Sequence, residues 1–261
     1  MKLIADTHLH IYPFYDVAQA LGALIDNLGA LDSEASRVGC LTERFDCNIY
    51  QQLAENPDSV LGNAYAVSVT DGALEITRNS DNAGVTLLPG QQIITSENLE
   101  ILMLNSAVRI TEGTTADQTV RMILDTGGLP VIAWGFGKWL GGRGKVVEEL
   151  VQRFNGNEIA IGDSTMRPVG WPVPGPYKRG KARGIRTIFG SDPLPFNGEE
   201  VRPGSYATRI TLPQDNRSIA EAFRSLLQTD FQGEAAGKRS SPLELAGRMQ
   251  GHRRKGRIAG S

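Results

Sequence analysis

The chain has 261 residues, of which 40% are hydrophobic and 21% charged, and its formal net charge is −2. This composition is that of an ordinary soluble globular protein, and the near-neutral charge argues against wholesale binding to nucleic acid or a membrane surface. No apolar run approaches the roughly 18 residues that span a bilayer. The first residues lack the apolar core of a signal peptide, and the two cysteines form no disulfide framework. We therefore expect a cytoplasmic protein.

Short apolar runs alternate with helical patterns in the first half of the chain. The predicted elements are, in chain order, a strand at 3–5, a helix at 17–28 after Asp16, a strand at 37–44, a short helix around 48–55, a hairpin over 63–78 that turns at Asp71-Gly72, and continuations at 85–95 and 99–105. The Asp-Gly pair between alternating residues is typical of a tight hairpin turn.

The second half repeats the alternation more clearly. Its predicted elements are a helix after the capping box of Thr115 and Gln118, a buried strand at 129–134, a helix after the glycine-rich loop 135–144, strands at 158–164 and 184–192, and a helix capped by Ser218 and Glu221. Repeated βα units of this kind predict a parallel sheet covered by helices, and single α/β barrels commonly have this length.

The C-terminal stretch differs in composition. Between Lys238 and Ser261, seven basic residues stand against one acid, Glu244, among many Gly and Ser. We expect a barrel domain over residues 1–232 and a basic, flexible tail over 233–261. Solvated disorder is one interpretation of the tail, and contact with nucleic acid or an acidic partner is the other.

Acids and histidines follow several predicted strands. They are Asp6, His8 and His10 after the first strand, Glu43 and Asp46 after the second, Asp163 after a later one, and Asp192 after the last. In a barrel the C-terminal ends of the strands converge on one face. His8 and His10 share a side because alternate residues of a strand do so. Two imidazoles with the carboxylate of Asp192 would suit zinc, iron or manganese.

Simpler interpretations exist for the same residues. A His-x-His pair is short and arises by chance. Asp163 and Asp192 would serve as helix N-caps, a frequent role of Asp after a strand. Glu43 would pair with the neighbouring Arg44 or face solvent.

Three basic residues are candidate contacts for an anion. Lys138 and Arg143 lie in and after the glycine-rich loop, where backbone and helix N-terminus can approach a ligand. Arg167 follows Asp163. The loop lacks the spacing of a phosphate-binding P-loop, and a turn whose side chains pack on neighbouring helices is the alternative.

The sequence also resembles a known family. "ADTHLHIYP" at residues 5–13, "LPGQQIIT" at 88–95, "GGLPVIAWGFG" at 127–137 and "FGSDPLPF" at 189–196 are similar to the successive motifs of the polymerase-and-histidinol-phosphatase (PHP) domain. The resemblance covers roughly residues 1–230. It implies an α/β fold with a distorted seven-stranded (β/α) barrel, and two or three metal ions that activate water against phosphate esters.

The match is partial. His8, His10 and Asp192 fall on motif positions, whereas the expected metal ligands are replaced by Gln92, Trp134 and Leu194, and the second motif has Phe45 and Asn48. The resemblance therefore implies a reduced site, in which His8, His10 and Asp192, with Gln92 or water, hold a single divalent ion. Asp192 and Asp6 are the candidate catalytic residues, with Asp6 as an outer ligand that orients an imidazole.

Three hypotheses follow. The leading one is a metal-dependent hydrolase of PHP type that acts on a small-molecule phosphoester, with Lys138, Arg143 and Arg167 as anion contacts. The second is a catalytically degenerate barrel that acts as a binding or regulatory module, because several ligands are lost. The third is an interaction protein that reaches its partner through the basic tail.

Overall fold

The computed structural model describes residues 1–212, 217–227, 229, 231 and 233–258. Its strands are β1 (Lys2–Leu9), β2 (Ser36–Glu43), β3 (Tyr65–Thr70), β4 (Ala73–Arg78), β5 (Gly84–Ile94), β6 (Glu100–Leu104), β7 (Leu129–Ala133), β8 (Ala160–Ser164), β9 (Arg186–Gly190), β10 (Tyr206–Thr211) and β11 (Glu234–Gly237). Its helices are α1 (Val17–Leu31), α2 (Ile49–Glu55), α3 (Pro57–Leu61), α4 (Ala116–Asp125), α5 (Gly142–Arg153), α6 (Gly175–Ala182), α7 (Ile219–Leu227) and α8 (Pro242–Ile258), with a 3₁₀ turn at Gly62–Ala64. Within these described residues, no helix combines the length and the apolar character that crossing a bilayer requires.

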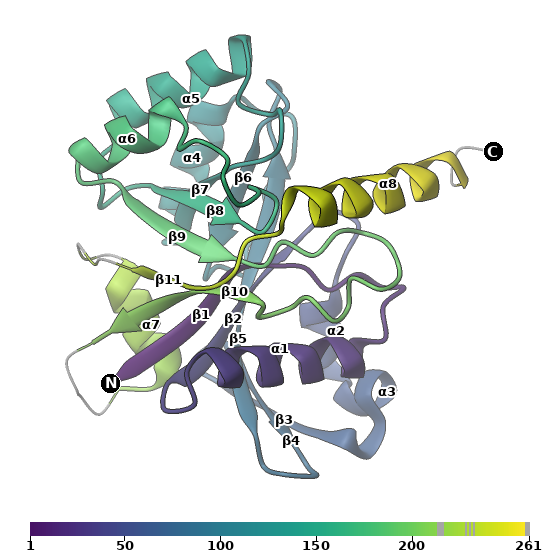
Figure 1. Ribbon diagram of the computed structural model, residues 1–261. Helices are drawn as coiled ribbons and strands as arrows, with labels where there is room; N and C mark the ends of the chain where they lie inside the picture. The colour runs from purple at the N-terminus through teal and green to yellow at the C-terminus, as the bar shows by residue number, and fades with distance from the viewer. Residues whose placement is uncertain (213–216, 228, 230, 232, 259–261) are drawn as a thin grey trace.

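The strands form one mixed sheet that curls into a nearly closed barrel (Figure 1). Its order is β11-β10-β1-β2-β5-β6-β7-β8-β9, and the β3–β4 hairpin attaches to β5 through β4. The pairs β1–β2, β2–β5, β7–β8 and β8–β9 are parallel, whereas β6 runs against both its neighbours. β9, at one end of the path, closes against β1: the amide of Asp192, just after β9, donates to the carbonyl of His8 in β1 at 2.8 Å.

The α/β class is as the sequence predicts, but the sheet differs from the expectation in two ways. Its path has nine strands rather than seven, because β10 and β11 extend it antiparallel beyond β1. It is also mixed rather than parallel. Residues 95–99, which join β5 to β6, are too few for the crossover that a parallel neighbour needs.

Helices cover the outer face of the curled sheet and one end of the barrel. In Figure 1, α1, α2 and α3 lie at the bottom, and α4, α5 and α6 at the top. The barrel interior is filled by an apolar cluster that includes Leu3 and Ala5 at the start of β1 and Phe223 of α7. Since α7 packs at the end where β1 begins, the other end of β1, with His8 and His10, is left for a polar site.

Local signals in the sequence are confirmed. Asp71 and Gly72 both have positive φ, 51° and 75°, as the predicted two-residue hairpin turn between β3 and β4 requires. Thr115 and Gln118 form the predicted capping box at the start of α4. Both features depend only on neighbouring residues, which is why sequence alone predicts them.

Within the stretch predicted as a basic, flexible tail, the structure has β11 and α8. β11 pairs with β10 in the main sheet, so a boundary at 232/233 cuts through the sheet, and α8 follows. α8 is fixed by Arg248, which is 4% exposed and forms an ion pair with Glu199 at 2.6 Å. A buried pair between residues 49 positions apart leaves no trace in local composition. Residues 259–261 and 232 lie outside the described residues.

Gly190, the last residue of β9, allows the close approach of β9 to β1. A Cβ at this position would lie 2.3 Å from the amide nitrogen of His8, which is rigid backbone. We expect Gly190→Ala to lower the free energy of unfolding by about 1–3 kcal/mol, the usual cost of overpacking. Gly142→Ala, where a Cβ meets nothing within 4 Å, is the matched control and should change it little. Chemical denaturation measures the free energy of unfolding of both variants. Equal effects of the two substitutions would contradict the close approach of β9 to β1.

Candidate metal centre

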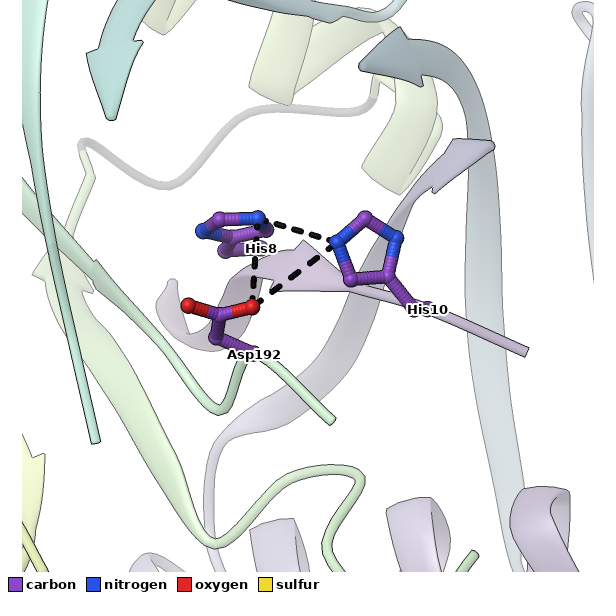
Figure 2. A group of neighbouring side chains, drawn as sticks. All are labelled: His8, His10 and Asp192. Carbon is purple, nitrogen blue, oxygen red and sulfur yellow. Dashed lines mark hydrogen bonds and ion pairs between the residues drawn. The ribbon is translucent and has the colours of Figure 1, made fainter. Parts of the chain in front are cut away.

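Two histidines and an aspartate meet at the C-terminal ends of β1 and β9 (Figure 2). The Nε2 atoms of His8 and His10 are 3.0 Å apart. The Oδ1 atom of Asp192 lies 3.6 Å from Nε2 of His8 and 3.9 Å from Nε2 of His10. The structure thus brings together the three residues that the sequence singles out, from segments more than 180 residues apart.

The backbone around Asp192 is held in an unusual conformation. Its φ is 52°, in the left-handed region that Asp adopts more readily than most residues. Its amide donates to the carbonyl of His8, and its own carbonyl accepts from Nη2 of Arg248 at 2.9 Å. The hydroxyl of Ser164, at the end of β8, donates to Oδ2 at 2.9 Å. These contacts leave Oδ1 directed at the two imidazoles.

The electrostatics favour ligands in the protonation states that bind metals. Burial lowers the pKa of the His10 imidazole to about 3, and neighbouring His8 adds to this effect. Burial opposes ionisation of Asp192, but His8, His10 and Arg248 outweigh it and hold the pKa of this carboxyl below its usual range. His10 is therefore neutral and Asp192 charged near pH 7, as metal binding requires.

The donor set fits one divalent ion. Ligand atoms at about 2.0–2.1 Å from a tetrahedral zinc are about 3.3 Å apart, and the three separations of 3.0, 3.6 and 3.9 Å lie around this value. Oε1 of Gln92, in β5, is 3.4 Å from Nε2 of His8. The 3.0 Å contact is a hydrogen bond in which the Nε2–H of one imidazole donates to Nε2 of the other. The residues present thus fit zinc, manganese or iron.

Asp6, predicted as a catalytic residue, lies beneath the site rather than in it. Its carboxylate is fully buried and accepts from the amides of His8, Ser191 and Gly204 and from the Ser191 hydroxyl. Burial raises its pKa despite these bonds. Asp6 therefore fixes the backbone on both sides of the site, at His8 and next to Asp192, and does not orient an imidazole directly.

The additional acids predicted for the site are directed elsewhere. Asp163 is buried and binds Arg167 through two hydrogen bonds, of 2.8 and 2.5 Å. Glu43 accepts a hydrogen bond of 3.1 Å from the amide of Tyr50, the second residue of α2. Its side chain lines a separate cavity. Asp46 is half exposed and pairs with Arg44 at 3.4 Å. None of the three is among the described residues that line the cavity beside the metal centre.

That cavity has a volume of about 290 Å³. His10, Gln92 and Asp192 line it together with polar, apolar and aromatic side chains that include Tyr12, Arg44, Glu100, Glu112, Phe136, Lys138, Leu194, Met249 and His252. We call it the metal cavity.

Of the three predicted anion contacts, only Lys138 lines the metal cavity, and it is paired with Glu100. Arg143 donates to the carbonyl of Gly137 at 3.1 Å, and Arg167 is bound to Asp163. Arg44, which was not predicted as an anion contact, lines the cavity from the end of β2. An anionic group at this site would therefore meet Arg44 and Lys138.

Sequence reasoning missed the part of α8 that borders the site. Arg248 binds Glu199 and the carbonyl of Asp192, and Met249 and His252 line the metal cavity. A signal was present, because Leu245, Arg248, Met249 and His252 follow the spacing of one helix face. Two of these four residues, Arg248 and His252, are polar, so the face does not show the apolar pattern that predicts a buried helix face.

The pKa of His10 predicts a pH dependence of stability. Below about pH 6.5 the unfolded chain binds a proton at this imidazole, whereas the folded chain does so only near pH 3. Stability of the metal-free protein should therefore fall as the pH drops through this window, by up to about 1.4 kcal/mol per unit from this group. Urea unfolding in the presence of a chelator measures this effect. Between pH 6.5 and 5, the free energy of unfolding of the wild type should fall by up to about 2 kcal/mol more than that of His10→Gln. Parallel pH profiles would contradict the assignment.

Comparison with known proteins supports the fold. No protein-family model matches the chain, and a search of curated proteins gave no match. Among solved structures, PsfC from Pseudomonas syringae PB-5123 is similar, with a TM-score of 0.62 and 17% identity over 97% of this chain and 98% of that one. The lesion-specific endonuclease PfuEndoQ from Pyrococcus furiosus is similar at a TM-score of 0.48 and 13% identity, over 89% of this chain and 58% of that one.

At 17% identity the likeness to PsfC shows a shared fold only, and the weaker likeness to the endonuclease adds nothing to that conclusion. Fold and site together define an α/β protein with a nearly closed barrel-like sheet and a group of two histidines and one aspartate that could bind a metal ion.

Proposed function

We propose that the protein is a metal-dependent hydrolase of PHP type with a single-metal site, and that its substrate is a small phosphoester. His8, His10 and Asp192 hold the ion, and Gln92 is the fourth donor. The observation that carries the proposal is the convergence of three ligand atoms, all within 4.8 Å of one another, beside a cavity that can admit a small molecule. The resemblance of the sequence motifs favours phosphoester hydrolysis among the reactions of such a site.

A divalent ion in this site would lower the pKa of water to about 7 and polarise an ester oxygen. The chain's own residues provide the remaining conditions. Ser164 and Arg248 fix Asp192, so the site is preorganised. Arg44 and Lys138 supply positive charge towards an anionic group, and Phe136 and Leu194 add apolar surface to the cavity. Glu100 and Glu112 oppose a highly charged substrate, which favours a diester or monoester of low charge.

A binding or regulatory module is the second candidate, and a specific observation favours it. The position expected to bear a histidine holds Trp134, which is buried in the apolar core, and Leu194 adds apolar surface to the metal cavity. A site with these losses would bind a ligand without turning it over.

Hydrolysis by the metal-loaded protein separates the two candidates. We expect zinc- or manganese-loaded protein to cleave a member of a panel of phosphomonoesters and phosphodiesters, and Asp192→Asn to abolish this activity. Asp125→Asn removes an exposed acid at the end of α4, outside the metal cavity, and should leave the activity unchanged. Binding of panel members without turnover, at every metal and pH, would favour the module and refute the hydrolase.

A further inference from the structure

A second, larger cavity lies next to the metal cavity. It has a volume of about 990 Å³ and runs between the loop at residues 168–171 and the first turns of α8. We call it the apolar groove, because Gln250 is the one polar side chain among the described residues that line it and no charged side chain does. The apolar side chains used below are Phe136, Val169, Trp171, Leu243 and Met249.

These side chains are unusually exposed. Leu243 is 85% exposed, Val169 53%, Phe136 45% and Trp171 42%. The rings of Phe136 and Trp171 pack at 5.2 Å between centroids, so they form one continuous aromatic surface that faces solvent. Contiguous apolar surface of this kind marks a binding site more often than an isolated exposed leucine does.

The groove and the metal cavity are adjacent because Phe136 and Met249 line both. α8 carries one wall of the groove, and its Arg248 is bonded to the carbonyl of Asp192. A molecule at the metal centre that reached past Phe136 would enter the groove.

The two volumes have different chemistry. The metal cavity, at about 290 Å³, is at the lower end of the roughly 300–1,000 Å³ of small-molecule sites and is polar around Asp192. The groove offers more room and an apolar lining. Together they match a molecule with a charged head and an apolar extension.

We infer that the apolar groove binds an alkyl or aromatic group of the same substrate whose ester lies at the metal centre. The substrate class is then an amphipathic phosphoester. This inference rests on the proposed function, because it places the reacting group at His8, His10 and Asp192.

Alkylphosphonates test the inference, since they keep the anionic head and cannot be hydrolysed as esters. Methyl-, butyl- and octylphosphonate are titrated into zinc-loaded protein by calorimetry. Affinity should rise with chain length, by up to about fourfold for each methylene that leaves water. Leu243→Asp and Ala246→Trp, both at exposed positions that line the groove, should flatten the rise. Leu140→Asp, at a site 72% exposed and outside both linings, should preserve it.

The outcomes distinguish this inference from the proposed function. If methyl- and octylphosphonate bind the zinc-loaded protein equally well, the groove inference is wrong and the metal centre is unaffected. If the His8→Ala/His10→Ala variant keeps the full affinity and the full dependence on chain length, the groove binds alkyl groups independently of the site, and the link to the metal centre is refuted. A dimer in sedimentation that Leu243→Asp dissociates, without any dependence on chain length, would assign the groove to a second copy and overturn the inference.

Discussion

Asp192→Asn should reduce metal affinity far more than any other single acid-to-amide change in the chain. The substitution replaces the one anionic ligand among the three with a neutral amide, while His8 and His10 remain. Loss of an outer partner typically costs about 10- to 100-fold in affinity, and loss of a ligand should exceed this. Competition with a chromophoric zinc chelator measures the effect.

Two controls set the scale for Asp192. Ser164→Ala removes only the hydroxyl that donates to Oδ2 and should fall within the outer-partner range of about 10- to 100-fold. Asp46→Asn removes an acid outside the metal cavity and should not change affinity. If Asp192→Asn binds zinc as tightly as Asp46→Asn does, Asp192 is not a ligand.

Arg248→Met should destabilise the protein and weaken the metal centre together. The substitution leaves Glu199, 3% exposed, without its principal partner, and breaking a buried ion pair in this way costs about 3–5 kcal/mol. It also removes the donor to the carbonyl of Asp192, so metal affinity should fall as well. Urea unfolding of the metal-free protein measures the first effect, and zinc competition measures the second.

Arg202→Met is the matched control for Arg248. Arg202 also lies near Glu199, at 3.9 Å, but is partly exposed and pairs mainly with Glu244. Its loss should cost at most about 1 kcal/mol, as for other exposed pairs, and should not affect zinc. The double variant Glu199→Gln/Arg248→Met should recover part of the lost stability, because it removes both charges. Equal effects of the two arginine substitutions would contradict the anchoring role of Arg248.

The three candidate ligands were predictable because the signals for them in the sequence are local. His8 and His10 lie two residues apart at the end of an apolar strand, and Asp192 ends another strand. The convergence of strand ends in a barrel brings them together, as the structure shows. The capping box of α4 and the turn at Asp71 follow from neighbouring residues in the same way.

The residues around the ligands were not predictable in the same way. In β8, Asp163 and Ser164 lie on opposite faces, and only the register of the strand decides that Ser164 faces Asp192 while Asp163 faces Arg167. Asp163 is the site residue that the sequence predicts, but the hydroxyl of Ser164 is the group that contacts Asp192.

α8 was missed for a different reason. The burial of Arg248 depends on Glu199, which lies in an irregular segment after β9. No composition or periodicity relates the two residues, so a helix with a buried arginine was mistaken for a basic tail. Long-range ion pairing decides this part of the fold.

The central claim is that His8, His10 and Asp192 form one metal site. A calorimetric titration of chelator-treated protein with zinc tests this claim most directly. One equivalent should bind to wild type, and none to the His8→Ala/His10→Ala variant, while both proteins remain folded by circular dichroism. Wild-type protein that binds no stoichiometric zinc, manganese or iron, or a double variant that binds like wild type, would contradict the claim.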